Sequence, residues 1–345
     1  MKVLAIDIGA GTQDILLFDS ERKIENCISL VLPTPSRIFA QKLKTITGNV
    51  YIYGDTIGGG SLNRAIINHI KKGYRVIMDE KAAYSIRNDL DEVRSMGIEI
   101  GKKPPSDSFS ELEICEIDLK LLKDFLINFG EDISEVDAIA IAVQDHGVSP
   151  KGVSDRVFRF ENIKAMLIKD NRPESFHFLD NEVPNYLLRM KSAVDAVRRY
   201  SQKPLFLMDT AFSAILGCMD EVKGASLVVN MGNGHTISAL LIGGKIEGIY
   251  EHHTHVLNPK KLESDLRLFI KGELSSKKVL EEDGHGVITL TPFSGKPSVI
   301  VTGPNRDIFQ STSFEFKYAS PGGNMMMTGP IGLVKAVQYR FRKQS

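Results

Sequence analysis

The sequence predicts an α/β protein with two lobes around a central cleft, and three observations carry that prediction. Short apolar runs of strand character alternate with segments of helical period along most of the chain. A segment near the amino terminus, LAIDIGAGTQDILLFD (4–19), has a second copy, LVVNMGNGHTISALLI (227–242). The chain has 345 residues, which is enough to bury the cores of two lobes.

The expected elements follow the hydrophobic pattern in chain order. In the first half, strands are expected over 50–54, 74–78 and 136–143. Helices are expected over 61–73, from the end of the second strand to about residue 96, and over 119–130. In the second half, helices are expected over 185–200, from 210 and over 331–343, and strands over 204–209 and 298–303. The run VDAIAIAV (136–143) is apolar throughout, which is typical of a strand buried on both faces.

The two copies align residue by residue over their glycines. The matches are Leu4 with Leu227, Asp7 with Asn230, Gly9 with Gly232, Gly11 with Gly234 and, after one extra residue at His235, Thr12 with Thr236. An interval of roughly 220 residues is too long for a solenoid repeat. The copies therefore indicate two related lobes, each opening with a hairpin around a Gly-x-Gly bend.

Composition excludes several classes of protein. Lys plus Arg and Asp plus Glu both number 43, so there is no basic field, and neither nucleic acid nor a membrane surface is expected as a partner. No apolar stretch reaches the length of a membrane span, and Asp7 interrupts the only run that could start a signal peptide. Three cysteines with no CxxC pair fit a reducing compartment, so a cytoplasmic location is expected.

The first Gly-x-Gly-Thr bend has the chemistry of a phosphate loop. Gly9 and Gly11 let backbone N–H groups approach an anion closely, and the Thr12 hydroxyl adds a donor. Asp7 would repel a bare phosphate, but it fits if Mg²⁺ lies between them. One such segment could equally be a bulged hairpin with capping polar residues. The second copy favours phosphate binding.

Five segments, in the correct order, resemble the superfamily of actin, sugar kinases and heat-shock chaperone ATPases. DIGAGTQDILLFD and VVNMGNGHTISALL resemble its two phosphate loops, and LMDTAFSAILG resembles the segment before the second loop. VIVTGPNRDIF resembles its adenosine motif, and GGNMMMTGPIGLVKA its final connecting helix. The resemblance implies two ribonuclease-H-like lobes with a nucleotide cleft between them. The lobes would cover 1–200, with the C-terminal helix 326–345, and 201–325.

The same resemblance implies ATP and Mg²⁺ as cofactors and a set of site residues. Asp7 would hold Mg²⁺ and take part in catalysis. The nucleotide-binding set would be Gly9, Gly11, Thr12 and Gln13 in the first loop, Asn230, Gly232, Asn233, Gly234 and Thr236 in the second, and Gly303 with Pro304 beside the nucleoside. Family members usually have Asp where this chain has Asn230, and an amide cannot accept a proton, so hydrolysis is expected to be slow.

The stretch VDAIAIAVQDHG resembles one in carbohydrate kinases, and it makes Asp145 the candidate catalytic base. The alternative is that Asp145 caps the following loop. The expected function is phosphoryl transfer to a small hydroxylated acceptor, or slow ATP hydrolysis. The other candidate is a nucleotide-gated regulatory protein with an unknown protein partner. The oligomeric state stays open.

Two further features leave alternatives. Alternation in EHHTH (251–255) would place His253 and His255 on one strand face as a metal pair with His235, His285 or Glu251, unless these are solvated loop histidines. The overall pattern also resembles a prokaryotic family that carries the label pyruvate formate-lyase activating enzyme. Such enzymes hold an iron–sulfur cluster with CxxxCxxC, which this sequence lacks, so that activity is not expected.

Overall fold

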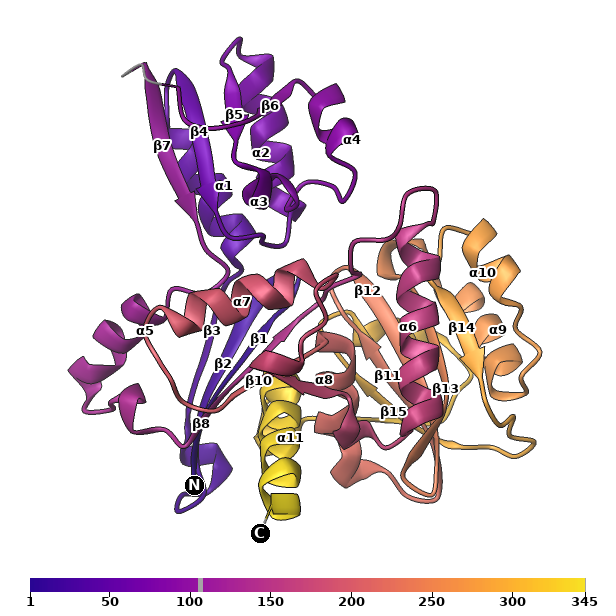
Figure 1. Ribbon diagram of the computed structural model, residues 1–345. Coiled ribbons are helices and arrows are strands. Elements are labelled where there is room, and N and C mark those ends of the chain that lie inside the picture. Colours follow the sequence, from indigo (N-terminus) through magenta and orange to yellow (C-terminus); the bar gives the residue numbers. More distant parts are fainter. Residues whose placement is uncertain (105–107, 345) are drawn as a thin grey trace.

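The first lobe is built on a six-stranded sheet (Figure 1). The computed structural model describes residues 1–104 and 108–344. The strand order in the first sheet is β3 (Ile28–Pro33), β2 (Thr12–Asp19), β1 (Lys2–Ile8), β8 (Ala138–Val143), β10 (Leu205–Met208) and β9 (His177–Leu179). The chain runs through β1, β2 and β3 as an antiparallel meander, and β8 then pairs parallel to β1 on its other side.

The second lobe repeats this arrangement. Its sheet has the order β14 (Gly286–Thr289), β13 (Lys245–His253), β12 (His235–Ile242), β11 (Ala225–Met231), β15 (Ser298–Thr302) and β16 (Phe316–Tyr318). Again a run of antiparallel strands, here the four strands β11 to β14, is followed by two strands parallel to the first of them. The shared order 3-2-1-4-5 is that of a ribonuclease-H-like lobe. The predicted fold class, two such lobes in an α/β protein, is confirmed.

The central strands are apolar because layers cover both of their faces. In β1, Val3 and Ala5 face the core shared with the helices between the two sheets, while Leu4 and Ile6 face the opposite layer. All four side chains are at most 1% exposed. The continuous apolar pattern of the parallel strand β8 has the same origin, as the sequence predicted.

Two helices cross between the sheets and connect the lobes, α8 (Thr210–Gly217) and α11 (Thr328–Gln344), the latter yellow at the centre of Figure 1. They approach so closely that a methyl group at Gly217 would overlap the Thr328 carbonyl, and one at Gly332 would overlap the Ser213 carbonyl. Glycine at both positions is therefore a packing requirement. Ala336 and Val337 of α11 lie in the same core as β1, so this helix does cover the first sheet.

The predicted lobe boundary at residue 200 needs correction. Strand β10 pairs with β8 in the first sheet, so the first lobe continues at least to Met208. The remaining helices flank the sheets: α5 (Leu119–Leu126), α6 (Asp155–Lys169), α7 (Leu188–Arg198), α9 (Pro259–Ile270) and α10 (Ser276–Glu281). Within the described residues, no helix is both long and apolar enough to cross a bilayer.

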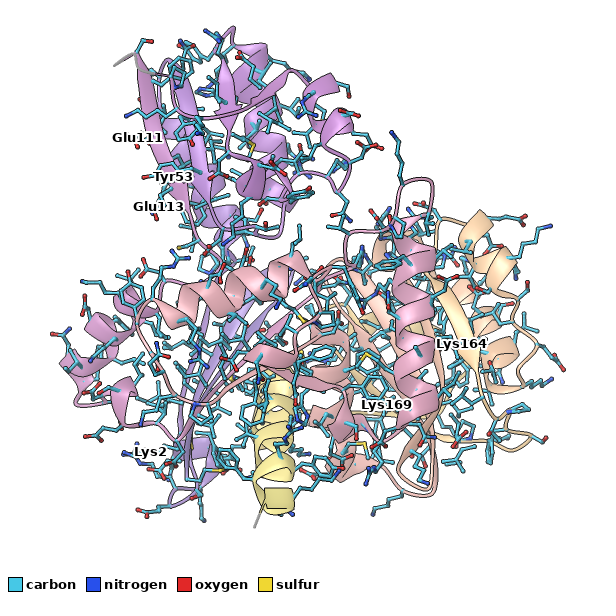
Figure 2. All side chains as sticks on the ribbon, in the orientation of Figure 1. Lys2, Tyr53, Glu111, Glu113, Lys164 and Lys169 are labelled. Carbon is cyan, nitrogen blue, oxygen red and sulfur yellow. The ribbon has the colours of Figure 1, made fainter. Side chains whose placement is uncertain are left out.

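A third, smaller sheet was not predicted as a separate unit. Its four parallel strands have the order β6 (Ile98–Ile100), β5 (Val76–Met78), β4 (Asn49–Gly54) and β7 (Phe109–Ile114), and they pack with α1 (Pro35–Thr45), α2 (Gly60–Lys71), α3 (Glu80–Ala83) and α4 (Leu90–Ser95). This unit is inserted between β3 and α5 and stands above α7 in Figure 1. Its outer face carries the labelled Tyr53, Glu111 and Glu113 (Figure 2).

Ion pairs and a backbone hydrogen bond fasten this third unit to α7. The buried Asp55 carboxylate accepts two hydrogen bonds from Arg199, each 2.7 Å long. Lys81 reaches Asp195 at 2.7 Å, and the Thr56 N–H donates to Ser192 Oγ at 2.9 Å. The unit has its own hydrophobic core, so these contacts position it on the first lobe without merging the two cores.

Candidate functional site

The first glycine bend joins β1 to β2. Asp7 and Asp14 face each other across this strand pair, and the Gly9 N–H donates to the Thr12 carbonyl at 2.9 Å, which closes the turn. The Thr34 hydroxyl holds the Gly9 carbonyl at 3.1 Å. Two carboxylates therefore stand at the base of a short, tied glycine turn.

The second bend, between β11 and β12, has the same geometry. The Gly232 N–H donates to the His235 carbonyl at 3.0 Å, and Asn230 pairs with Ile237 across the strands. The Gly232 carbonyl accepts from Thr254 Oγ1 at 2.8 Å and from Asn305 Nδ2 at 2.9 Å. Both bends are thus anchored from behind through the carbonyl of their first glycine.

The equal geometry corrects the predicted alignment of the two copies. The turn hydrogen bond spans three residues in each bend, so the counterpart of Thr12 is His235 and no residue is inserted. The predicted match of Thr12 with Thr236 is therefore wrong. Thr236 corresponds to Gln13.

The two bends meet across a single cleft between the lobes. A methyl group at Gly11 would overlap the Asn233 side chain, and one at Gly234 would lie 3.4 Å from Ala10 Cβ. The cleft is lined by most of the predicted site residues: Asp7, Gly9, Thr12, Asn230, Gly232, Asn233, Gly234, Gly303 and Pro304.

The segment that resembles the adenosine motif also lines this cleft, through Gly303 and Pro304. Gly303 follows β15 with φ +96°, and any β-carbon there would overlap the Met231 carbonyl. Only glycine fits both the left-handed backbone and the close approach. The neighbouring Thr302 hydroxyl hydrogen-bonds that of Thr328 at 3.0 Å, which ties the end of β15 to the start of α11.

Two predicted site residues point away from the cleft. Gln13 Nε2 donates to the Pro33 carbonyl at 2.9 Å, on the neighbouring strand. The Thr236 hydroxyl is fully buried and bonds Thr254 Oγ1 at 3.1 Å, behind the second bend. These two equivalent positions hold the hairpins in place, and alternation along a strand explains why both side chains leave the cleft.

Asp145 is not placed in the cleft either. Its Oδ1 accepts from the Gly147 N–H at 2.9 Å, and its Oδ2 accepts from the N–H groups of Arg189 and Met190 at 2.9 and 3.0 Å. Asp145 therefore satisfies amides in its own loop and in the first turn of α7. This arrangement favours the capping alternative over the predicted role of a catalytic base.

Three carboxylates gather on the first-lobe side of the cleft. Desolvation raises the pKa of Asp7 well above its usual value, and the nearby Asp14 and Asp209 raise it further. Burial raises the pKa of Asp14 to about 7, against the opposing effect of its 3.4 Å hydrogen bond from Thr12. One oxygen of Asp7 and one of Asp14 are buried without a hydrogen-bond partner. These two carboxylate oxygens could therefore bind a cation.

Asp209 was missed by the sequence analysis. It follows β10, accepts from the Ala211 N–H at 2.9 Å at the start of α8, and pairs with Arg159 at 2.7 Å. Arg159 also donates to Glu251 at 3.0 Å, and all three side chains are buried. The signal was present: like Asp7, Asp209 is a carboxylate at the end of an apolar strand.

A comparison with known protein families covers the second glycine bend but not the first. The profile described as "Putative pyruvate format-lyase activating enzyme (DUF1786)" matches residues 57–308, more than half of the chain. The chain belongs to the DUF1786 family. No curated protein sequence matches it.

Solved structures resemble this DUF1786 protein only with low TM-scores. The activator of 2-hydroxyisocaproyl-CoA dehydratase from Clostridium difficile, with bound ADPNP, is 8% identical, with 99% and 98% of the two chains covered and a TM-score of 0.38. MreB5 of Spiroplasma citri, bound to ADP, is 12% identical, with 99% and 98% covered and a TM-score of 0.35. Scores of this size do not establish a common fold, so the fold assignment rests on the sheet order of this chain.

The cysteines of this DUF1786 protein lie apart from the cleft. Cys27 and Cys218 are buried free thiols in the core between the sheets, and Cys115 packs on the core of the third sheet. Among the described residues, the group of side chains able to share a metal ion contains no cysteine. No cluster of thiolates therefore accompanies the glycine bends.

The rings of His253 and His255 are neighbours, with centroids 5.5 Å apart, but among the described residues neither belongs to the group able to share a metal ion. Strand β13 ends at His253, and a short 3₁₀ turn over Thr254–Val256 takes His255 to the surface. His253 faces His235 across the strand pair, with ring centroids 4.8 Å apart.

Proposed function

We propose that this protein binds an adenine nucleotide with Mg²⁺ in the cleft between the lobes and hydrolyses it slowly. The observation that carries the proposal is the meeting of two glycine bends, one from each lobe, beside buried carboxylate oxygens that have no partner. A polyphosphate with a divalent cation matches this combination of backbone donors and carboxylates.

The tips of the bends supply the donors. In the described part of the chain, no intramolecular hydrogen bond uses the N–H groups of Ala10, Gly11, Asn233 or Gly234. Asn233 and Ala10 are exposed, and the glycines beside them are half-buried. Unpaired amides in glycine-rich turns form concave anion sites, so a phosphate chain lying between the bends would meet donors from both lobes.

Asp7 and Asp14 fit a magnesium ion. Each has a buried oxygen without a partner, and a cation there would satisfy both and offset their mutual repulsion. When bound, the ion would neutralise charge on the phosphates during transfer. The chain's own part is to hold the carboxylates at the base of the first bend and to exclude water from one side.

Slow turnover follows from the second bend. Asn230 occupies the position equivalent to Asp7, where an amide can neither take up a proton nor neutralise a cation. The hypothesis of phosphoryl transfer to a hydroxylated acceptor relied on Asp145 as the base. Both oxygens of Asp145 accept backbone hydrogen bonds, which does not support that role. These contacts favour hydrolysis over transfer.

A nucleotide-gated regulatory role is the second candidate, and the α8–α11 crossing favours it. The lobes are joined there by two helices in backbone contact at Gly217 and Gly332, and the bends that would close on phosphate lie at the same cleft. Small changes in lobe angle would therefore follow occupancy of the cleft. The activity named in the family's description is not proposed, since the sequence has no CxxxCxxC motif.

Thermal melting in buffer, Mg·ATP, Mg·ADP and Mg·GTP tests the proposal. A ligand at about 100 times its Kd stabilises the folded state by ~2.7 kcal/mol, so an adenine nucleotide should raise Tm by several degrees. Omitting Mg²⁺ should reduce the shift. The absence of a shift with every nucleotide would overturn the proposal, while equal shifts for ATP and GTP would remove only its adenine specificity. Phosphate release over hours then separates slow hydrolysis from binding alone.

A further inference from the structure

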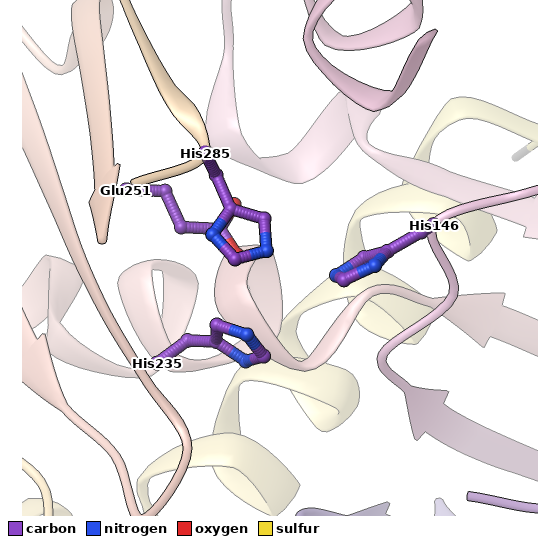
Figure 3. A group of neighbouring side chains, drawn as sticks. All are labelled: His146, His235, Glu251 and His285. Carbon is purple, nitrogen blue, oxygen red and sulfur yellow. The ribbon is translucent and has the colours of Figure 1, made fainter. Parts of the chain in front are cut away.

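Four side chains from separate segments converge beside the cleft (Figure 3). They are His146, His235, Glu251 and His285, and each offers one ligand atom such that all four atoms lie within 4.8 Å of one another. Glu251 and His285 are at most 1% exposed, and His146 and His235 are half-buried. In Figure 3 the three rings and the carboxylate point into a common space.

The fold brings these residues together from both lobes. His146 lies in the loop after β8 of the first lobe, whereas His235 begins β12, Glu251 lies in β13 and His285 immediately precedes β14. The strands β12, β13 and β14 are neighbours in the second sheet, with Glu251 paired to both Ile237 and Gly286. Three members are therefore fixed by one sheet, and the fourth faces them across the lobe boundary.

Hydrogen bonds orient the cluster in the manner of a metal site. Gln144 Nε2 donates to Glu251 Oε1 at 3.1 Å, so Gln144 Oε1 is the acceptor for His235 Nδ1 at 2.7 Å. That bond places the His235 proton on Nδ1 and leaves a lone pair on Nε2. Histidine ligands are commonly fixed by such an outer hydrogen bond.

The ring nitrogens that face the cluster have no partner. Nε2 of His146, Nε2 of His235 and Nδ1 of His285 are all buried without a hydrogen bond. Burial also lowers the pKa of each of these imidazoles, which keeps them in the neutral form that binds metals. Three unsatisfied nitrogens in one place are costly for a protein unless something binds them.

We propose that His146, His235, His285 and Glu251 bind one divalent transition-metal ion of the Zn²⁺ class. Three imidazoles and one carboxylate suit zinc and its first-row neighbours, whereas Mg²⁺ and Ca²⁺ take sets of oxygen ligands. Ligands about 2.1 Å from a tetrahedral ion lie about 3.4 Å from one another, so the widest pair would close by about 1.4 Å on binding. This site is separate from the magnesium proposed at Asp7, and it does not depend on nucleotide binding.

Surrounding charges leave the cluster able to accept a cation. Arg159 donates to Glu251 Oε2 at 3.0 Å, but it also pairs with Asp209 at 2.7 Å, so its charge is shared between two carboxylates. Each Glu251 oxygen keeps a second lone-pair direction after its single hydrogen bond. His253 covers the outer side, 4.6 Å from the His285 ring between centroids, without belonging to the ligand group.

A metal at this position would join the lobes next to the second glycine bend. His235 accepts the turn hydrogen bond of that bend through its carbonyl, and both His235 and Glu251 line the cleft. His146 alone comes from the first lobe. Occupancy would therefore hold the lobes at one angle and fix the position of the bend.

Metal binding to the full chain tests the proposal directly. Protein stripped with a chelator is titrated with Zn²⁺ against a chromophoric competitor, in the presence of millimolar Mg²⁺, and with Co²⁺, whose visible absorption reports nitrogen and oxygen ligation. We expect one ion per chain with submicromolar affinity. His146→Gln and Glu251→Gln should each weaken Zn²⁺ binding about 100-fold or more, since even outer-shell partners are worth about 10–100-fold.

His177→Gln is the matched control. His177 is also buried with an unpartnered Nε2, but it lies on β9 outside the cluster, so this variant should bind Zn²⁺ like the original chain. Circular dichroism confirms that each variant is folded. Stoichiometry well below one in the original chain, or equal loss of affinity in His177→Gln, would overturn the proposal. Because nucleotide is absent throughout, failure here is distinct from failure of nucleotide binding.

Discussion

The two glycine bends share a backbone but differ in chemistry. In each, the first glycine N–H closes the turn three residues later, at 2.9 Å in the first lobe and 3.0 Å in the second. Across the strands, the first lobe sets Asp7 against Asp14, while the second sets Asn230 against Ile237. The repeated fold thus supplies two similar glycine turns, and only the first has carboxylates at its base.

The second bend has an imidazole where the first has a hydroxyl, and an amide and an isoleucine where the first has carboxylates. His235 takes the place of Thr12 and belongs to the four-residue cluster with Glu251. Cations that prefer oxygen ligands would therefore collect at the first lobe, and those that prefer nitrogen at the second. The turn geometry is the same in both lobes because glycine and strand pairing fix it, whereas the side chains differ.

Restoring the symmetry of the bends should have the largest effect. Asn230→Asp introduces the carboxylate that the second bend lacks, and a positioned acid or base is worth about 10²–10⁴-fold in rate. We expect basal ATP hydrolysis to rise by about 10²-fold, measured as phosphate release. Asn230→Ser is the control and should leave the rate unchanged. Fast hydrolysis by the original chain would show that a residue other than Asn230 decides the rate.

The second-largest effect is expected from removing the charge at the first bend, and it should distinguish the roles of the two bends. Asp7→Asn keeps the shape of the side chain but loses a ligand and its charge, so the affinity for Mg·ATP should fall about 10–100-fold, as for other hydrogen bonds to charged groups. Without nucleotide the variant should melt no lower than the original, because it removes a buried ionisable group that lies near Asp14 and Asp209.

The matched change in the second lobe is Asn230→Ala. Its effect on Mg·ATP affinity should be about threefold or less, since a neutral group contributes little net binding. Calorimetric titration of both variants gives the comparison. Equal losses in the two lobes would contradict a division of labour between the bends.

The sequence was sufficient for the repeated hairpins and for the cleft they line. Local patterns carry that information: two apolar strands, a Gly-x-Gly bend and a carboxylate at the strand end. It was not sufficient for side-chain direction: Gln13 turns to the neighbouring strand, and Thr236 was placed in the cleft because one misplaced residue in the alignment reverses the face. The apparent insertion at His235 produced that error.

The sequence also could not predict which distant segments come together in the fold. His146 and His285 are 139 positions apart in number, and only the closure of one lobe on the other brings their rings within 5.0 Å of each other, centroid to centroid. The third sheet was likewise hidden, since its strands and helices have the same pattern as those of the first lobe. Periodicity identifies such elements without showing which sheet they join.

The crossing of α8 and α11 can be tested through its glycines. Gly332→Ala places a methyl group against the Ser213 carbonyl, and overpacking of this kind costs about 1–3 kcal/mol. Gly101→Ala, with open space around it, should change stability by less than ~0.5 kcal/mol. Urea unfolding monitored by circular dichroism measures both. A stable Gly332→Ala protein would show that the lobes can move apart at this point without loss.

The smallest expected effect concerns the residues that follow β8 and β15, the strands paired with β1 and β11. Asp7 pairs with Ala142 and Asn230 with Thr302, so the residues three positions further on, Asp145 and Asn305, are counterparts. Asn305 donates to the Gly232 carbonyl and holds the second bend, whereas Asp145 accepts three backbone amides. The same position thus anchors a glycine bend in one lobe and a helix start in the other.

Asp145→Asn should therefore act on stability alone. Loss of a cap costs about 0.5–2 kcal/mol, and an amide can serve only some of the three N–H groups. Asp118→Asn is the matched control, because Asp118 caps α5 through a single amide at 2.9 Å, and its cost should be smaller. Thermal melting gives both values, and Mg·ATP affinity and turnover should equal those of the original chain. A fall in turnover of about 10²-fold with unchanged melting would restore Asp145 as a catalytic base, because that is the effect of a lost general base and not of a lost cap.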